Sequence, residues 1–252
     1  MKKLLTVLLA LLLVLSMSAC TKKPEPEPEP EPEPTPEVTV MSHDEYVAAD
    51  LDSEVTVETY VQAANGWWDG KLTFYAQSED GAYFVYDMPI SEEEAKKFVP
   101  GQKVRLTGYK SAWSGEVEIV DATYELLDGS WIAPVTDVTD LLGKDELEKH
   151  QNEKVAFKGL TIVASKDANG EEHDWLYNWD GSGSEGNDIY FNVSPDGGAT
   201  VYTFLVRAYL TGPGTDVYEA GTTLEVGQTV DLEGYCYWYN GVNPHITAIA
   251  VK

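Results

Sequence analysis

A segment that occurs twice constrains the fold of this chain more than any other feature. Residues 99–115 read VPGQKVRLTGYKSAWSG, and much of this segment returns in residues 226–241. The residues that recur unchanged at an offset of 126 positions are Gly101, Gln102, Val104, Leu106, Gly108, Tyr109 and Gly115. A pattern kept over so many positions indicates a duplicated domain. Each copy predicts a turn, a strand with Val and Leu on one face, and then a glycine-containing aromatic loop.

Residues 1–19 have the pattern of a secretory signal peptide. Two lysines precede an apolar run over Leu4–Leu15, which is too short for a stable membrane span and suits the hydrophobic region of a signal. The small residues before Cys20 resemble the bacterial lipobox, whose cysteine becomes the first residue of the mature chain and carries lipid. Met17 stands where leucine is commoner in that motif. The resemblance implies lipidation of Cys20, and an ordinary signal peptide cut at an Ala-x-Ala-like site is the alternative.

Residues 20–40 form a spacer rich in proline and glutamate. From Pro24 to Pro36 the chain reads PEPEPEPEPEPTP, and proline at every second position forbids helix and sheet and favours polyproline II. At about 3.1 Å per residue this stretch reaches roughly 40 Å. We expect it to hold the rest of the chain away from a membrane, with the protein lipid-anchored outside the cytoplasm of a Gram-positive cell. A proline-rich recognition motif is the alternative.

Residues 41–129 and 130–252 are predicted to be the two copies of the duplicated domain. In the first copy, Ser42 and Glu45 form a capping-box pattern for a short helix, and apolar alternation then predicts three strands, a helix and two strands. This order resembles the OB-fold, a five-stranded barrel with a helix between strands three and four. The G-x-x-V-x-L-x-G-Y pattern is similar to that of OB domains in secreted and lipid-anchored bacterial proteins. The resemblance implies an all-β protein of two tandem OB-fold-like five-stranded barrels, each with a short helix before strand four.

Aromatic residues stand in the places that OB-folds use for binding. These folds bind along strands two and three, and the loops after strands one and four close over the ligand. The candidate ligand-binding residues that the resemblance implies are Trp67, Trp68, Trp113, Tyr75, Trp238 and Tyr239. Flat aromatic faces beside amide and carboxylate groups suit sugar rings or bases. The alternative is that the tryptophans close the barrel ends as core residues.

One acidic loop of the second copy is a candidate calcium site. Asp180, Ser182, Ser184 and Asp188 place side-chain oxygens at alternating positions of this loop, and calcium prefers oxygen ligands. The loop departs from an EF-hand, because Glu185 replaces the required glycine and no glutamate stands at the twelfth position. A flexible acidic turn is the alternative. No other cofactor is expected.

The chain does not have the pattern of an enzyme. Its four histidines are scattered, and no zinc-protease, nucleophile-elbow or phosphate-loop motif occurs. Cys236 alternates with the apolar residues of a predicted strand, so we expect a buried structural thiol rather than a nucleophile. A non-catalytic protein is the interpretation that follows, and an uncharacterised hydrolase is the alternative.

Charge argues against nucleic-acid binding, for which OB-folds are best known. The formal net charge is −26, and residues 41–129 hold 6 basic residues against 18 acidic ones. Nucleic-acid affinity rests largely on Lys and Arg, so we expect no nucleic-acid partner. The sequence favours a membrane-anchored, non-catalytic binding module for a glycan or another component of the cell envelope. A scaffold for envelope proteins is the second hypothesis, and OB-type nucleic-acid binding, which the acidic charge disfavours, is the third.

Overall fold

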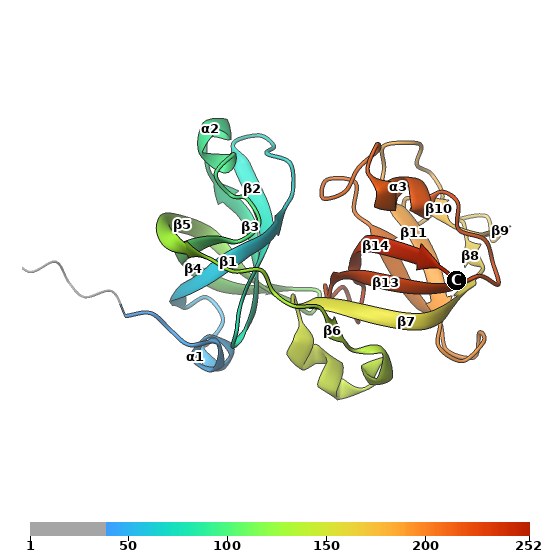
Figure 1. Ribbon diagram of the computed structural model, residues 1–252, viewed down its shortest axis with the longest axis horizontal. Coiled ribbons are helices and arrows are strands. Elements are labelled where there is room, and N and C mark those ends of the chain that lie inside the picture. The colour runs from blue at the N-terminus through green and yellow to red at the C-terminus, as the bar shows by residue number, and fades with distance from the viewer. Residues whose placement is uncertain (1–38) are drawn as a thin grey trace, which may run out of the picture. The chain divides into compact units, whose positions relative to one another are not determined.

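The first half of the chain forms a closed barrel. The computed structural model describes residues 39–252, and Figure 1 draws the first half in blue to green. Its elements are α1 (His43–Ala48), β1 (Glu54–Ala64), β2 (Lys71–Ser78), β3 (Gly81–Pro89), α2 (Glu92–Ala95), β4 (Gln102–Trp113) and β5 (Glu116–Ser130). The strands close in the order β1-β2-β3-β5-β4. This is the OB-like barrel that the sequence predicts, with a short helix before the fourth strand.

Alternation along the strands explains where the core of this barrel lies. Val55 and Val57 of β1 are buried, and so are Val104 and Leu106 of β4, whereas the residues between them are less buried. Successive side chains of a strand point to opposite faces, so the apolar ones fill the barrel interior. Each fully buried aliphatic side chain contributes about 1.5–3 kcal/mol relative to an exposed one.

The two helices of the first half begin at serine caps. The Ser42 hydroxyl accepts a hydrogen bond from the backbone N–H of Glu45, and the Glu45 carboxylate accepts one from the backbone N–H of Ser42. The predicted capping box is therefore confirmed. Ser91 caps α2 in the same way through the N–H of Glu94. Both caps satisfy backbone donors that the first turn of a helix leaves free.

The second half of the chain forms a seven-stranded sheet. Its longer elements are β7 (Lys154–Val163), β11 (Ile189–Ser194), β12 (Tyr202–Val206), α3 (Asp216–Gly221), β13 (Thr229–Tyr235) and β14 (His245–Val251). The shorter ones are β6 (Thr136–Asp137), the 3₁₀ helices η1 (Thr139–Leu141) and η2 (Asp145–His150), β8 (Ser165–Lys166), β9 (Glu172–His173) and β10 (Leu176–Tyr177). The sheet order is β10-β11-β12-β14-β13-β7-β6, and β8 pairs with β9 separately.

Five strands of the second sheet repeat the pairing of the first barrel. β11 pairs with β7 as well as with β12, for example between Val193 and Ile162. This extra pairing links β7, β11, β12, β14 and β13 into a ring, in the same order as β1, β2, β3, β5 and β4. The helix α3 comes before β13, as α2 comes before β4. Since all described residues belong to one compact unit, separate folding of the two halves stays a prediction.

Aromatic side chains join the two halves. Tyr75 of β2 stacks on Tyr235 of β13 with ring centroids 4.3 Å apart, and its hydroxyl shares a hydrogen bond of 2.7 Å with Nδ1 of His245. Phe84 of β3 contacts Tyr237 edge to face at 5.3 Å. Tyr75, Phe84 and Tyr235 form a small buried cluster apart from the two main cores. The two sets of strands are therefore held against each other by a core of their own.

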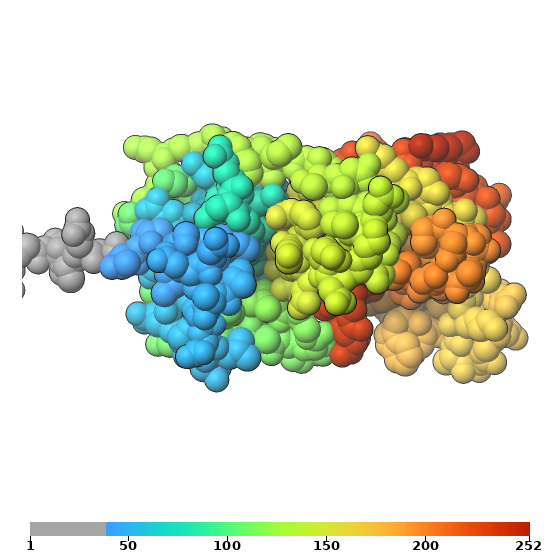
Figure 2. Space-filling view, turned by 90° about the horizontal axis from the view of Figure 1, so that it is seen from below, coloured from blue at the N-terminus to red at the C-terminus, as the bar shows by residue number. Residues whose placement is uncertain are grey.

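Backbone hydrogen bonds add to this junction. The N–H of Gly66 donates to the carbonyl of Tyr209 at 2.9 Å, and the N–H of Asn240 donates to the carbonyl of Ser114 at 2.6 Å. The Gln77 side-chain oxygen accepts from the N–H of Lys154 at 2.9 Å. Figure 2 shows the yellow-green segment that contains η1 and η2 lying beside this junction. These contacts set how the loops of one half face the loops of the other.

Several sequence predictions concern residues that the structure does not describe. The signal peptide, the lipidation of Cys20 and the spacer through residue 38 lie outside the described residues. Within residues 39–252, no helix is long and apolar enough to cross a membrane. The boundary expected between residues 129 and 130 falls within β5, whose end at Leu127–Ser130 pairs with β4. Cys236 is a free, buried thiol, as predicted, and desolvation raises its pKa well above the ordinary value.

Candidate ligand-binding cleft

A cleft of about 1200 Å³ lies along the junction, with walls from both halves of the chain. The first half contributes the β1–β2 loop, parts of β2 and β3, and the end of β4. The second half contributes parts of β11 and β12 and the loop between β13 and β14. Its aromatic lining consists of Trp68, Phe84, Tyr86, Trp113, Trp179, Tyr190, Tyr202, Tyr209, Tyr237 and Tyr239. This volume is ample for a small organic ligand.

Three tryptophans of the lining keep large exposed surfaces. The exposed fractions are 70% for Trp68, 55% for Trp113 and 74% for Trp179. Trp68 begins a tight turn that two backbone hydrogen bonds with Lys71 close, at 3.1 and 3.0 Å. A ring that a short turn holds outward cannot bury itself in the barrel. The alternative of core residues therefore does not describe Trp68 and Trp113, the two of these residues for which the sequence raises it.

Matching turns position one aromatic residue on each side of the cleft. Trp113 is followed by Ser114 and Gly115, both with positive φ, and Tyr239 is followed by Asn240 and Gly241, also with positive φ. A two-residue turn with positive φ at both positions reverses a twisted hairpin without strain. Trp113 and Tyr239 stand at equivalent positions of the repeated segment, and their ring centroids lie 5.2 Å apart. The repeat thus brings its own two copies together at the cleft.

The charged groups of the cleft are balanced. Its lining holds two acidic side chains, Asp69 and Asp87, and two basic ones, Lys71 and Arg207. Lys71 is paired with Asp87 at 2.9 Å, and Arg207 is paired with Asp188 at 2.6 Å. The hydrogen bond to Asp87 raises the pKa of Lys71. The cleft therefore lacks the strong negative charge of the chain as a whole.

His245 forms part of the cleft wall as a neutral ring. Burial, with a contribution from the charge of Arg207, lowers its pKa well below the ordinary value. Tyr237 stacks on His245 with centroids 4.3 Å apart, and Tyr75 bonds to its Nδ1. The position of the imidazole in the junction is therefore fixed. At neutral pH the ring is uncharged, so it cannot act as an imidazolium acid.

The structure brings together three of the six aromatic residues that the sequence singles out. Trp68, Trp113 and Tyr239 line the cleft. Tyr75 is buried in the junction. Trp67 lies in a smaller hollow near α2 and donates from Nε1 to the carbonyl of Ile90 at 3.0 Å. Trp238 packs against the core of the second half.

Other cleft residues have only a weak signal in the sequence. Trp179 lies in the loop after β10, and Tyr190 lies on β11. Arg207 and Tyr209 follow β12, and they line the cleft together with residues of the first half. A spacing of two along residues 201–209 would predict one shared face for Thr203, Leu205, Arg207 and Tyr209, although β12 ends at Val206.

The acidic loop proposed for calcium uses its oxygens within the chain. Asp188 accepts a hydrogen bond from the N–H of Ala208 at 2.8 Å and pairs with Arg207. Asp180 accepts from the N–H of Ser182 at 3.0 Å, and the side-chain and backbone hydrogen bonds of Ser182 lower its pKa. These contacts are those of a structured turn, and calcium binding there stays an untested expectation.

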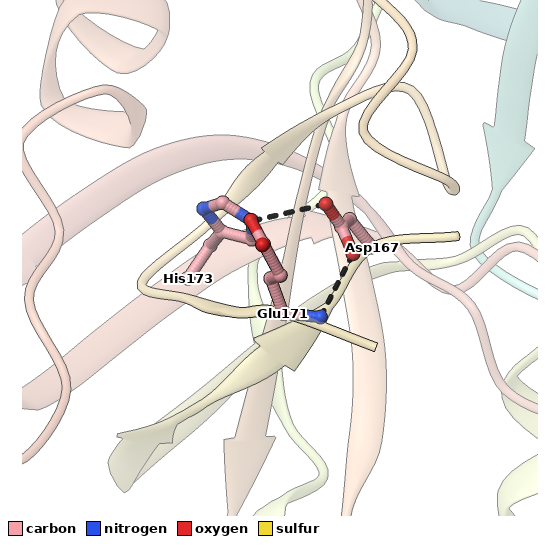
Figure 3. A group of neighbouring side chains, drawn as sticks. All are labelled: Asp167, Glu171 and His173. Atoms are coloured by element: carbon pink, nitrogen blue, oxygen red, sulfur yellow. Dashed lines mark hydrogen bonds and ion pairs between the residues drawn. The ribbon is translucent and has the colours of Figure 1, made fainter. Parts of the chain in front are cut away.

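Another group of metal-type side chains lies on the β8–β9 hairpin. Asp167, Glu171 and His173 point toward one another in Figure 3. Asp167 accepts hydrogen bonds of 2.9 Å from the N–H groups of Asn169 and Glu171, and its other oxygen lies 3.4 Å from Nε2 of His173. Although partial desolvation opposes them, these hydrogen bonds lower the pKa of Asp167. The carboxylate therefore serves the hairpin turn.

A buried carboxyl group lies at the junction. One oxygen of Glu116 accepts from the N–H of Trp238 at 2.9 Å, while the other finds no partner among the described residues. Burial raises the pKa of Glu116 to about 8, against the hydrogen bond from the backbone N–H of Trp238. The Oδ1 of Asn152 is also buried without a partner among the described residues. Charge interactions link this carboxyl to the other ionisable groups around it, which are Glu118, Tyr46, Tyr75, Tyr237 and Cys236.

Comparisons with known proteins identify no family. No family model matches the chain, and no curated protein matches it. Among solved structures, a murine DNA-binding protein bound to double-stranded DNA matches at 13% identity with a TM-score of 0.35, covering 78% of this chain and 94% of its own. The p204 HINb domain matches at 13% and 0.35, covering 81% and 100%. A replication protein A heterotrimer bound to single-stranded DNA matches at 8% and 0.28, covering 77% and 50%.

These matches correct two expectations, although their low TM-scores assign neither a family nor a ligand to this chain. The expectation of no nucleic-acid partner is wrong, because matched structures include DNA-bound proteins. The glycan or envelope-component ligand, and with it the envelope scaffold, is likewise not supported. The expectation of no nucleic-acid partner was based on the net charge of a whole domain, residues 41–129. The charge at the cleft is balanced, and a sum over distant surface acids does not describe it.

Proposed function

We propose that this chain is a non-catalytic binding protein that holds an unpaired nucleobase in the cleft, as part of a nucleoside, a nucleotide or a short single strand. One observation carries the proposal: aromatic rings from both halves line a single cleft of balanced charge. We assign no catalytic step to the site, because its imidazole is buried and its Nδ1 is engaged with the Tyr75 hydroxyl.

Stacking is the main attraction that the cleft offers. Base–aromatic stacking contributes roughly 1–3 kcal/mol per base in sites of this kind. Trp68, Trp113 and Trp179 expose more than half of their surfaces, and a flat ligand would remove that apolar area from water. A base inside a duplex presents only its edges, whereas an unpaired base presents its faces. The cleft therefore favours an unpaired base.

Charge favours a ligand with few phosphates. Both basic side chains of the lining already have carboxylate partners, and the chain carries a formal net charge of −26. A long phosphate backbone gains affinity from Lys and Arg that displace counterions, and this surface provides little of that. We expect nucleosides and short strands to bind, with long duplexes binding weakly.

Tryptophan fluorescence tests the proposal directly. Residues 39–252 are titrated with thymidine, guanosine and a short oligothymidylate, and with N-acetylglucosamine oligomers as a ring ligand that lacks a π system. Saturable quenching by nucleosides and by the oligonucleotide, without quenching by the sugars, supports the proposal. If neither nucleosides nor oligonucleotide bind, the proposal fails. Salt distinguishes the sources of the base, because only the affinity of the oligonucleotide should fall as salt rises.

We also propose that the two halves are tandem OB-like domains that fold separately. The support is that each half contains a ring of five paired strands. Fragments 41–129 and 130–252 should each melt cooperatively, as single domains do. The loss of a cooperative transition in both fragments would indicate one fused domain.

The location of the protein is a separate proposal that rests on the sequence. The lipobox-like residues before Cys20 and the proline-rich spacer support a lipid anchor outside the cytoplasm. Replacing Cys20 by Ala should move the protein from the membrane fraction into the medium. A variant that stays in the membrane fraction would contradict the lipid anchor.

A further inference from the structure

Arg207 is held in a fixed position at the wall of the cleft. Its Nη1 donates to Asp188 Oδ2 at 2.6 Å, and the other oxygen of Asp188 accepts from the backbone N–H of Ala208 at 2.8 Å. The backbone carbonyl of Arg207 accepts from Leu210 and Thr211. Both the start and the end of the side chain are therefore positioned.

The guanidinium keeps donors for a ligand. An arginine side chain carries five N–H donors in a rigid fork, and within residues 39–252 Asp188 is its one hydrogen-bond partner. The side chain is 37% exposed and lies in the cleft lining. Tyr209 supports it from one side, with the ring centroid 5.9 Å from the guanidinium carbon. The unused donors are thus accessible from the cleft.

The pairing with Asp188 decides which ligand group suits these donors. Because the carboxylate compensates the positive charge, the guanidinium offers directed donors more than net charge. A pair of adjacent neutral acceptors in the plane of a ring fits such a fork. Guanine presents this pair at O6 and N7, whereas adenine presents one acceptor beside a donor.

We infer that Arg207 makes the cleft selective for a purine ring with two adjacent acceptors, that is, a guanine-type edge. The inference rests on the proposed binding of a nucleobase and adds which base is preferred and by which residue. Asp188 is the positioning residue that holds the fork. The loop that resembles a calcium site in sequence thereby serves the cleft through its last residue.

Four nucleosides test the inference on the unaltered protein. Guanosine and inosine both carry O6 and N7, 7-deazaguanosine lacks the N7 acceptor, and adenosine replaces O6 by a donor. A bidentate contact is worth about 1–3 kcal/mol of discrimination, and 1.4 kcal/mol corresponds to tenfold in affinity. Guanosine and inosine should therefore bind about tenfold more tightly than 7-deazaguanosine and adenosine.

Arg207→Lys is the matched variant, because lysine keeps the charge and the ion pair but not the fork. It should bind guanosine and 7-deazaguanosine equally while its melting temperature stays near that of the parent. Equal binding of the four nucleosides by the unaltered protein would overturn the inference and leave nucleobase binding intact. If no nucleoside binds at all, both proposals fail. A guanosine preference that survives in Arg207→Lys would also overturn the role of this residue.

Discussion

The two copies of the repeated segment place the same residue types in opposite surroundings. Tyr109 in the first copy is 44% exposed, whereas Tyr235, its equivalent, is 4% exposed and stacks on Tyr75. The next position holds Lys110 in one copy and Cys236 in the other. Lys110 donates to the carbonyls of Val47 and Ala49 at 2.7 Å and holds the end of α1, while Cys236 is part of a core.

The two halves of the chain therefore meet through unequal surfaces, although each carries a copy of the repeated segment. The first half offers the β2–β3 surface with Tyr75, and the second half offers the end of β13 with Tyr235. Two identical barrels would each present the same surfaces. The burial of Tyr235 shows that its surface packs in the junction, whereas the exposed Tyr109 shows that the equivalent surface of the first half does not. The cleft lies along this junction.

The largest effect is expected where this difference in burial is greatest. Tyr235→Ala removes a buried, stacked ring and should lower the free energy of unfolding by about 3–5 kcal/mol, the cost of truncating a large aromatic residue in a core. Tyr109→Ala, at the equivalent exposed position, should cost about 0.5 kcal/mol or less. Chemical denaturation of both variants measures this. Equal losses would mean that the junction does not stabilise the protein.

A second effect depends on pH and acts through Glu116, whose equivalent in the second copy is Val242. A carboxyl with a pKa of about 8 in the folded chain and an ordinary value of 4.5 when unfolded favours folding while protonated. Its contribution is therefore complete below pH 4.5 and is lost as pH rises through about 8. Glu116→Gln keeps a neutral hydrogen-bonding side chain of similar shape and removes the titrating carboxyl. Between pH 5 and pH 8.5 the parent should lose on the order of 3 kcal/mol relative to this variant.

The exposed Glu54 provides a matched control for this pH effect. Glu54→Gln removes an exposed carboxylate and therefore controls for the loss of one negative charge. Thermal melts over the pH range compare the three proteins. A constant difference between the parent and Glu116→Gln would contradict a protonated acid at the junction.

The smallest effect concerns the equivalent residues that meet in the cleft. Trp113→Ala and Tyr239→Ala should each weaken nucleoside binding about tenfold, the loss of one stacking contact. Trp67→Ala should leave affinity unchanged, because that ring lies in a different hollow. Calorimetric titration with guanosine measures all three. If Trp113→Ala and Tyr239→Ala bind as the parent does, the contact between the two copies is structural only.

Local patterns predicted a large part of the fold. The Ser42–Glu45 capping box, the alternation of β1 and the burial of Cys236 all follow from interactions within a few residues or from the period of a strand. Such features need no knowledge of distant segments. The order of three strands, a helix and two strands resembles the OB-fold, and that resemblance predicted the closed barrel of the first half.

The cleft is the part that sequence patterns predicted least. The resemblance to OB-folds places Trp68 and Trp113 in loops that close over a ligand, and both residues line the cleft. Tyr75 of β2 was also a candidate for the binding surface, yet its ring is buried against Tyr235. Trp179 carried no signal as a binding residue, and Arg207 carried only a weak one. The cleft that they line is completed by residues of the other half of the chain.

The sequence by itself determined the β class, the strand alternation, the caps and the positions of the tight turns, because each depends on backbone conformation and on side chains close along the chain. Tertiary structure alone decided which copy of Tyr109 and Tyr235 is buried, which acid is paired with Arg207, and where the aromatic rings form a common cleft. The physical reason is that burial and ion pairing depend on what lies opposite. Residues that face each other across the junction, such as Tyr75 and His245, are far apart in the sequence and meet only when the two sets of strands pack together.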